Sequence, residues 1–110
     1  MRRRRDPFQA IADPTRRRIL DLLARRQTCP AGRIAAAFPH ISRPAVSRHL
    51  AVLRRAGLVI ADGIGREHRY RLDYAGLGRL QRDWFERFLP VSLEALKSQV
   101  EAGIRRKKAG

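Results

Sequence analysis

The sequence of 110 residues has one cysteine and no long apolar run, and these two absences exclude several classes of protein. A single cysteine cannot form a disulfide within the chain, which is typical of proteins kept in a reducing compartment. No apolar stretch approaches the roughly 20 residues needed to cross a bilayer. The basic residues 1–5 are followed by Asp6 and Pro7 rather than by the apolar core of a secretion signal. We therefore expect a cytoplasmic protein with no membrane partner.

Arrangements typical of enzymes are also missing. The sequence has no carboxylate pair and no Ser-His or Cys-His spacing that would support acid–base or nucleophilic catalysis. His40, His49 and His68 fall in three different expected elements, and Cys29 has no evident activating base, so we interpret it as a structural cysteine rather than a redox switch. The sequence therefore predicts no enzymatic activity, no cofactor and no metal site.

Acidic residues are absent from Leu22 to Ala61, and this stretch contains seven arginines. The whole chain carries 25 Lys and Arg against 10 Asp and Glu, a formal net charge of +15. A charge of this size favours a polyanionic partner such as nucleic acid. Because the acid-free stretch concentrates the positive charge, we expect the DNA-binding surface there.

The stretch from Ser42 to Gly57 predicts a helix with one apolar and one basic face. Ser42 is a suitable N-cap, the following Pro is tolerated in the first turn, and Gly57 is a typical C-terminal glycine. Val46, Leu50 and Leu53 recur at intervals of four and three, which places them on the core side. The opposite face, which is suited to entering a groove of DNA, carries Arg43, Ser47, Arg48 and Ala51.

A shorter helix is expected immediately before it, from Cys29 to Phe38. Two short helices joined by a tight turn, the second with a basic face, are the signature of a helix-turn-helix. Residues Leu58 to Asp62 and Glu67 to Asp73 then alternate like two strands, joined by a turn at Gly63-Ile64-Gly65. This hairpin would form a wing, and the basic residues placed to reach phosphates or a minor groove are Arg66, Arg69 and Arg71.

Two further helices are expected near the N-terminus, because Asp6-Pro7 and Asp13-Pro14 each place a capping Asp before a Pro at the first helical position. The first helix is short and is expected to expose Phe8 and Ile11. The second extends to about Arg25 and is expected to direct its three consecutive arginines, Arg16, Arg17 and Arg18, mostly outward.

A final helix is expected from about Ala75, capped by Asp73, with more apolar surface than a monomer would expose. Pro90 removes one helical hydrogen bond, so we expect a kink or a break at Leu89-Pro90, with a kink in one long element favoured. The expected organisation is a basic arm at residues 1–5, one domain at residues 6–104 and a disordered basic tail at residues 105–110. The arm is expected to be disordered, with a phosphate or minor-groove contact as the alternative.

The order of these elements resembles the ArsR/SmtB family of bacterial winged helix-turn-helix repressors over about Asp6 to Ala102. The resemblance implies a mainly α fold of about five helices plus a two-stranded wing. It also implies a homodimer that binds a palindromic operator in double-stranded DNA. The motifs that carry it are Asp13-Pro14-Thr15-Arg16-Arg17, Ser42-Arg43-Pro44-Ala45-Val46-Ser47-Arg48-His49-Leu50, Ala56-Gly57-Leu58-Val59 and Tyr70-Arg71-Leu72-Asp73.

By this resemblance, base edges would be read by Arg43 and Arg48, and guanidinium forks pair well with guanine in the major groove. Phosphate or accessory contacts would come from Ser42, Ser47 and His49. The first and last helices would form the dimer interface, with Phe8, Ile11, Trp84, Phe85, Phe88 and Leu89 as its residues.

The sequence departs from the metal-sensing members of the family. Their cysteine box aligns with Pro30 to Ile34, where no cysteine is found, and no histidine follows His68. The chain is thus more similar to the metal-independent branch. Three alternatives stay open: a DNA-binding subunit whose signal is sensed by a separate partner protein, a regulator with a metal or ligand site outside the family's positions, and membrane-surface binding by residues Val91 to Lys108.

Overall fold

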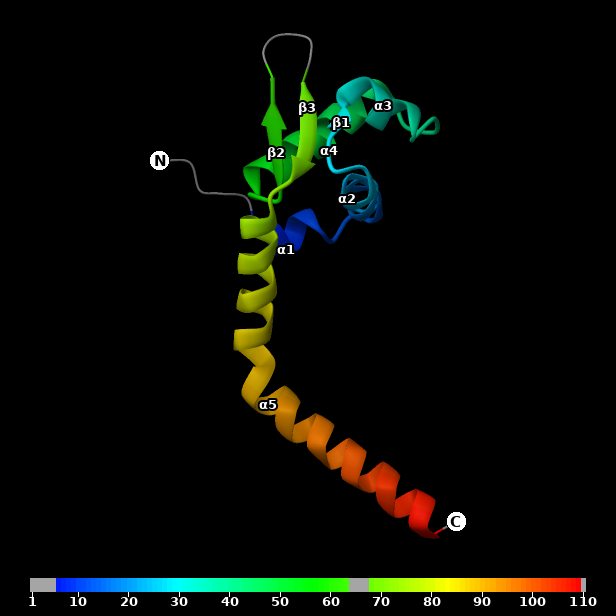
Figure 1. Cartoon of the computed structure of the whole chain (residues 1–110), viewed down its shortest axis with the longest axis vertical. Helices are drawn as coiled ribbons and strands as arrows, with labels where there is room; N and C mark the ends of the chain where they lie inside the picture. Colours follow the sequence, from blue (N-terminus) through cyan, green and yellow to red (C-terminus); the bar gives the residue numbers. More distant parts are fainter. Residues whose placement is uncertain (1–5, 64–67, 110) are drawn as a thin grey trace. The chain divides into compact units, whose positions relative to one another are not determined.

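The computed structural model describes residues 6–63 and 68–109, without the side chains of residues 87–93 and 107–109. The chain forms two compact units, Met1–Leu80 and Gln81–Gly110. The first unit contains most of the elements shown in Figure 1. The elements are α1 Pro7–Ala10, α2 Pro14–Arg26, β1 Cys29–Pro30, α3 Ala31–Ala36, α4 Arg43–Arg55, β2 Val59–Asp62, β3 Arg69–Leu72 and α5 Tyr74–Ala109. This confirms a mainly helical fold with a β-hairpin wing.

Helix starts follow the predicted caps. In each case a side-chain oxygen accepts a hydrogen bond from a backbone N–H that has no partner within the helix. Such caps fix where each helix begins and therefore where its first side chains lie. The pairs are Asp6 with the N–H of Phe8 at 2.9 Å, Asp13 with Arg16 at 3.0 Å, Ser42 with Ala45 at 3.2 Å and Asp73 with Gly76 at 3.0 Å.

The end of α4 is closed by the turn predicted at Gly57. Gly57 has φ 78°, and the N–H of Leu58 donates to the carbonyl oxygen of Leu53 at 3.0 Å, as in a Schellman motif. Helix α5 packs directly on this turn, because a Cβ atom added to Gly76 would lie 1.6 Å from the carbonyl oxygen of Gly57. Two glycines therefore allow the end of helix α4 and the first turn of α5 to approach closely.

A single apolar core lies beneath these elements in the first unit. Ile19 and Leu23 of α2, Ile34 of α3 and Leu53 of α4 are each fully buried. Leu77 and Leu80, in the first turns of α5, are half-buried and pack against the same cluster. The helix-turn-helix is thus attached to α2 on one side and to the wing on the other.

The sheet has three strands, in the order β1-β3-β2, rather than the two that the sequence predicted. Strand β1 is antiparallel to β3, with Cys29 opposite Tyr70 and Pro30 opposite Arg69. The expected helix from Cys29 to Phe38 is therefore wrong at its start, since its first two residues are extended and α3 begins at Ala31. Proline has no N–H to donate to a neighbouring strand, so Pro30 is compatible with a short strand at the edge of the sheet but not with a longer one.

Two expectations near the N-terminus also differ from the structure. Phe8 and Ile11 are half-buried rather than exposed. Arg16 is half-buried rather than outward, and Arg17 is exposed but donates to the carbonyl oxygens of Ile11 and Ala12 at 2.8 and 3.1 Å. Carbonyl groups at the end of α1 lack helical partners, so they attract these guanidinium donors.

The second unit is helical along its described length. Helix α5 has no break at Pro90, so the hypothesis of one long element is confirmed. It continues to Ala109, whereas the sequence predicted disorder from Arg105. Arg, Lys and Ala all favour helices, and cations near a helix C-terminus interact well with its dipole. The expected arm at residues 1–5 lies outside the described residues, as does Gly110. No described helix is both long enough and apolar enough to span a membrane.

Candidate nucleic-acid interface

Helix α4 presents the basic face that its periodicity predicts. Val46 and Leu50 are each 2 % exposed, and Leu53 is fully buried, so one side of the helix lies in the core. On the other side four residues expected to contact DNA are exposed: Ser42, Arg43, Ser47 and Arg48. In the structure Arg43 and Arg48 have neither an ion pair nor a side-chain hydrogen bond with the described residues. Their guanidinium groups are therefore available to an external partner.

The turn that presents α4 is held by backbone hydrogen bonds and by packing. The N–H of Ile41 donates to the carbonyl oxygen of Phe38 at 3.1 Å, just before the capping Ser42. Phe38 and Ile41 are half-buried against the core. The start of α4 thus has a fixed position relative to α3.

His49 occupies a different position from the exposed residues of α4. It is half-buried, and its Nδ1 atom lies 3.4 Å from the Nη1 atom of Arg16. The same guanidinium group donates from Nε to the carbonyl oxygen of Ala10 at 2.6 Å and from Nη2 to that of Gln9 at 3.2 Å. Arg16 therefore joins the end of α1 to the middle of α4.

Asp13 lies at the edge of this cluster. Burial raises its pKa, but the backbone N–H of Arg16 and the charges of His49 and Arg16 oppose this, and the net pKa is lowered from its ordinary value. Asp13 is therefore an ionised cap that stabilises the start of α2 and the position of Arg16.

The wing carries two of the three arginines that the sequence placed there. Arg69 is exposed on β3. Arg71 is also exposed, but its Nε donates to the Oδ2 of Asp62 on β2 at 2.6 Å, an ion pair between two partly exposed side chains. Arg66 lies outside the described residues. Of the two wing arginines that the structure describes, Arg71 has an ion pair and Arg69 has none with any described residue.

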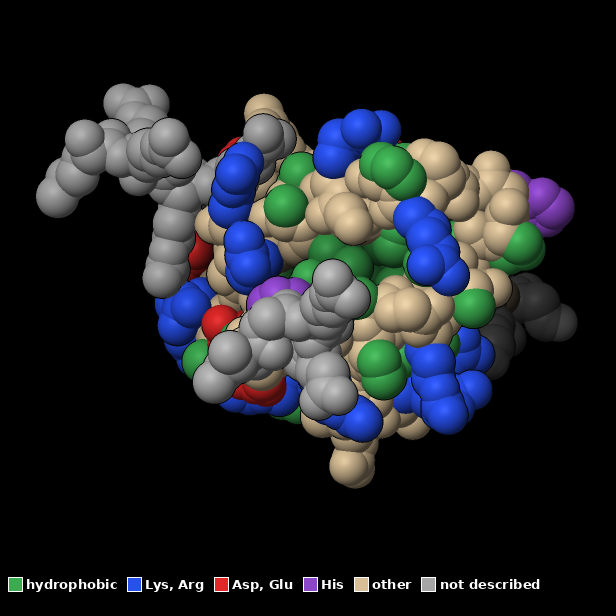
Figure 2. Space-filling view, turned by 90° about the horizontal axis from the view of Figure 1, so that it is seen from above, with side chains coloured by type: hydrophobic (Ala, Val, Ile, Leu, Met, Phe, Trp, Pro, Cys, Tyr) green, Lys and Arg blue, Asp and Glu red, His purple; other side chains and the backbone are tan. Residues whose placement is uncertain are grey.

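The charge distribution agrees with the acid-free stretch of the sequence. Figure 2 looks onto the wing end of the chain and shows Lys and Arg side chains spread over this face. The acidic side chains visible there gather at one side. A duplex approaching this face would meet an excess of positive charge, which favours association with phosphates.

The expected interface residues of α5 lie in the second unit. Trp84 and Phe85 are 53 % and 51 % exposed, large values for aromatic side chains. Leu96, Val100 and Ile104 are also more than half exposed and recur every four residues, which places them along one side of the helix. The side chains of Phe88 and Leu89 lie outside the described residues. The second unit therefore presents apolar surface that is suited to protein association.

No metal centre is found among the residues that the structure describes. In this part of the chain there is no group of three or more His, Cys, Asp or Glu side chains that could hold a metal ion. Cys29 is 3 % exposed and free, at the start of β1.

Sequence reasoning missed Arg16, although a signal for it exists. A helix of four residues ends in carbonyl groups without partners, and Arg16 and Arg17 follow only six residues later. An arginine shortly after a very short helix is thus a candidate donor to the end of that helix.

Residues 11–60 match a family described as a helix-turn-helix domain. Among curated proteins, the HTH-type transcriptional regulator Rv2034 of Mycobacterium tuberculosis is 44 % identical over 95 residues, which cover 86 % of each chain. The transcriptional repressor SdpR of Bacillus subtilis is 50 % identical over 52 residues, which cover 47 % of this chain and 56 % of SdpR.

Solved structures give the same result for the fold. A possible transcriptional regulator for arsenical resistance has 41 % identity and a TM-score of 0.68, and the match covers 86 % of this chain and 95 % of that chain. The homodimeric winged helix-turn-helix DNA-binding domain of Mb0332 from Mycobacterium bovis, described as a possible ArsR-family regulator, has 31 % identity and a TM-score of 0.56. That match covers 79 % of this chain and 72 % of the Mb0332 chain.

Proposed function

Because this chain belongs to the ArsR/SmtB family of winged helix-turn-helix transcriptional regulators, we propose that it is a homodimeric repressor that reads a palindromic operator with helix α4. Each protomer would place α4 in one of two successive major grooves, about 34 Å apart. Bound in this way, the dimer would block access to a promoter. Such a regulator works where the chromosome is, in the cytoplasm.

The exposed arginines of α4 carry this proposal. Arg43 lies at the first position of the helix and Arg48 five residues later, and the structure gives neither guanidinium a partner among the described residues. Each would donate to the O6 and N7 atoms of a guanine. Ser42 and Ser47, exposed beside them, would donate to phosphates.

The remaining candidate contacts have different roles. His49 is half-buried against Arg16, so we propose that it supports the position of α4 and approaches the DNA less closely than Ser47. In the wing, Arg66 and Arg69 would contact the flanking backbone. Arg71 would do so only on leaving Asp62, its present partner.

We assign the dimer interface to the first and last helices. The exposure of Trp84 and Phe85 supports this, because burial of aromatic side chains is a major source of stability in protein interfaces. Phe8 and Ile11 are half-buried, and a second copy of the chain would complete their burial. We also assign Phe88 and Leu89, which lie on the same helix as Trp84, to the interface. Sedimentation at micromolar concentration is expected to give the mass of two chains, and a single-chain mass would contradict the assignment.

The proposal is tested by selecting bound fragments from the native genome and titrating one of them by fluorescence anisotropy. We expect a palindromic site and an affinity that falls steeply with salt, because the logarithm of the association constant falls by about 0.9 per phosphate neutralised for each unit of log salt. A scrambled duplex of equal length is the control. Equal affinity for both duplexes, or a flat salt response, would contradict sequence-specific binding by this basic face.

A further inference from the structure

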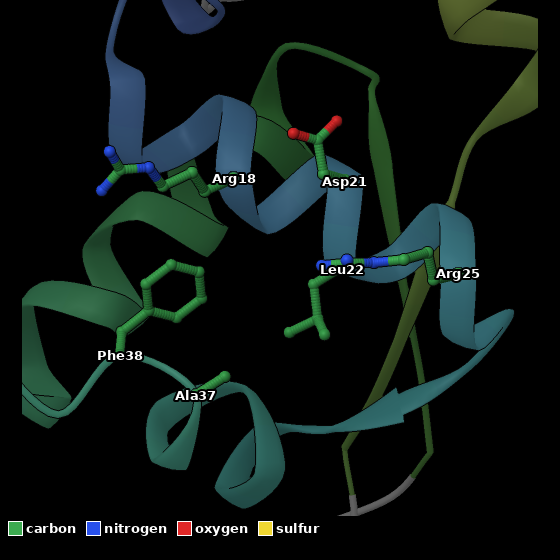
Figure 3. A pocket seen from close by; sticks show the side chains of 6 residues that line it. All are labelled: Arg18, Asp21, Leu22, Arg25, Ala37 and Phe38. Carbon is green, nitrogen blue, oxygen red and sulfur yellow. The ribbon is translucent and has the colours of Figure 1, made fainter.

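A groove lies between helices α2 and α3. It consists of two cavities of about 210 and 340 Å³ that share Leu22 and Ala37 as lining residues. The first cavity extends to Phe38 and the second to the buried Cys29. Figure 3 shows Leu22, Ala37 and Phe38 directed into the same hollow. We call this feature the α2–α3 groove. The second cavity falls within the range of volumes found for small-ligand sites, and the apolar residues of the groove form its floor.

The rim of the α2–α3 groove is strongly basic. Arg18 and Arg25 line the first cavity, and Arg26 and Arg33 line the second. Asp21 is the one carboxylate among the lining residues, and in Figure 3 it points away from Ala37 and Phe38, whereas Arg25 runs alongside Leu22.

These four arginines have no internal partner. Within the described part of the chain, none of them makes an ion pair or a side-chain hydrogen bond. By contrast, Arg16 and Arg17 of α2 donate to carbonyl oxygens at the end of α1 and just after it. Four guanidinium groups around an apolar floor favour a ligand with an anionic head and an apolar body.

We propose that the α2–α3 groove is an effector site for a small organic anion, a carboxylate or sulfonate on an aromatic or alkyl body. The apolar body would lie on Leu22, Ala37 and Phe38, and the anionic group would be held by guanidinium groups such as those of Arg25 and Arg33. This assignment deepens the proposed function, on which its regulatory part rests.

The groove is connected to the DNA-binding helix through Phe38. Phe38 lines the cavity, and its carbonyl oxygen accepts the N–H of Ile41 in the turn that leads to the cap of α4. A ligand wedged between α2 and α3 would displace this turn and with it the start of α4. Occupancy is therefore expected to weaken operator binding, and by linkage the operator weakens ligand binding by the same factor.

The test uses the whole protein and the fluorescent anion 8-anilinonaphthalene-1-sulfonate, with neutral N-phenyl-1-naphthylamine as a probe of similar apolar body without the sulfonate. The double variant Arg25→Gln/Arg33→Gln is compared with the matched control Arg54→Gln/Arg55→Gln, exposed arginines at the end of α4. All four positions are exposed, so both variants are expected to keep the fold, as thermal unfolding checks.

We expect the anion to bind the wild type and the control equally, and to bind the groove variant about tenfold or more weakly, since charged hydrogen bonds are lost. The neutral probe should not distinguish the three proteins. Equal binding of the anion to all three would overturn the site, because the probe would then be held elsewhere, for example on the apolar surface of α5.

The proposed effector role is tested by measuring the affinity of the protein for operator DNA with and without the anionic probe. We expect saturating anion to lower operator affinity at least fivefold in the wild type and to have little effect on the groove variant. Unchanged operator affinity would overturn the effector role. If the groove variant instead binds all duplexes more weakly and with a reduced salt slope, the arginines contact phosphates and the ligand site is wrong. If the protein without probe does not bind DNA sequence-specifically, the proposed function itself is contradicted. This outcome is distinguishable from failure of the ligand site, which is measured by probe binding.

Discussion

The Nη1 atom of Arg16 lies 3.4 Å from the Nδ1 atom of His49, and this contact joins α2 to α4. Arg16 also donates to the carbonyl oxygens of Ala10 and Gln9, so one guanidinium links the end of α1 to α4. Helix α1 belongs to the proposed dimer interface and α4 to the DNA interface. One guanidinium group therefore contacts both the helix assigned to the dimer interface and the helix assigned to the DNA interface.

Replacing Arg16 with Ala is expected to destabilise the protein by about 1–3 kcal/mol, because the carbonyl group of Ala10, a buried residue, loses its guanidinium donor. The matched control is Arg18→Ala in the same helix, which has no internal partner and should change stability by less than about 0.5 kcal/mol. Urea unfolding followed by circular dichroism measures both. Similar effects of the two substitutions would show that the contacts of Arg16 contribute nothing specific.

The contact between Gly76 and Gly57 gives a second prediction. A Cβ at position 76 would overlap the carbonyl oxygen of Gly57 at 1.6 Å, so Gly76→Ala must displace backbone and is expected to cost about 3 kcal/mol or more. Gly32→Ala is the control, since a Cβ there meets nothing within 4 Å and Ala favours the helix by about 0.5–1 kcal/mol. A mild effect of Gly76→Ala on the thermal midpoint would mean that α5 does not pack on the end of α4.

How much the sequence predicts depends on whether each feature is encoded locally. The capped helices, the two faces of α4 and the hairpin β2–β3 were predicted because Ser42, Gly57 and the alternation along the strands are local signals. Strand β1 was not, because two residues carry no periodicity and Cys29 pairs with Tyr70 far along the chain. The contacts of Arg16 and the α2–α3 groove depend on tertiary packing in the same way.

The lowered pKa of Asp13 predicts a pH dependence of stability. Its carboxylate contributes stability that is fully present above the unfolded-state pKa, about 3.9, and is lost as the pH falls through the lower folded-state pKa. Asn caps a helix as well as Asp but does not titrate in this range. We therefore expect Asp13→Asn to be less stable than the wild type at pH 7 and to approach it near pH 2. Urea unfolding at both pH values measures the difference, and a difference independent of pH would contradict the ionised cap.

Breaking the ion pair of Arg71 with Asp62 is expected to change the affinity for DNA rather than the stability of the fold. Both side chains are about half exposed, so losing the pair should cost less than about 1 kcal/mol. Asp62→Asn removes a negative charge from the wing and releases Arg71. We expect it to strengthen binding to operator and scrambled duplexes alike and to steepen the salt slope by about 0.9 if one phosphate contact is gained. Weaker binding of both duplexes would indicate that the ion pair holds the wing in its binding conformation.

The central claim is that exposed guanidinium groups of α4 read bases, and Arg48→Ala tests it most directly. Anisotropy titrations compare wild type, Arg48→Ala and the control Arg79→Ala, an exposed arginine of α5, on the operator, on operators changed at one base pair and on a scrambled duplex. We predict a loss of about 1–3 kcal/mol for Arg48→Ala on the operator, with discrimination lost at one base position and little change for the control. An equal loss on the operator and the scrambled duplex would contradict base reading by Arg48 and leave it a phosphate contact.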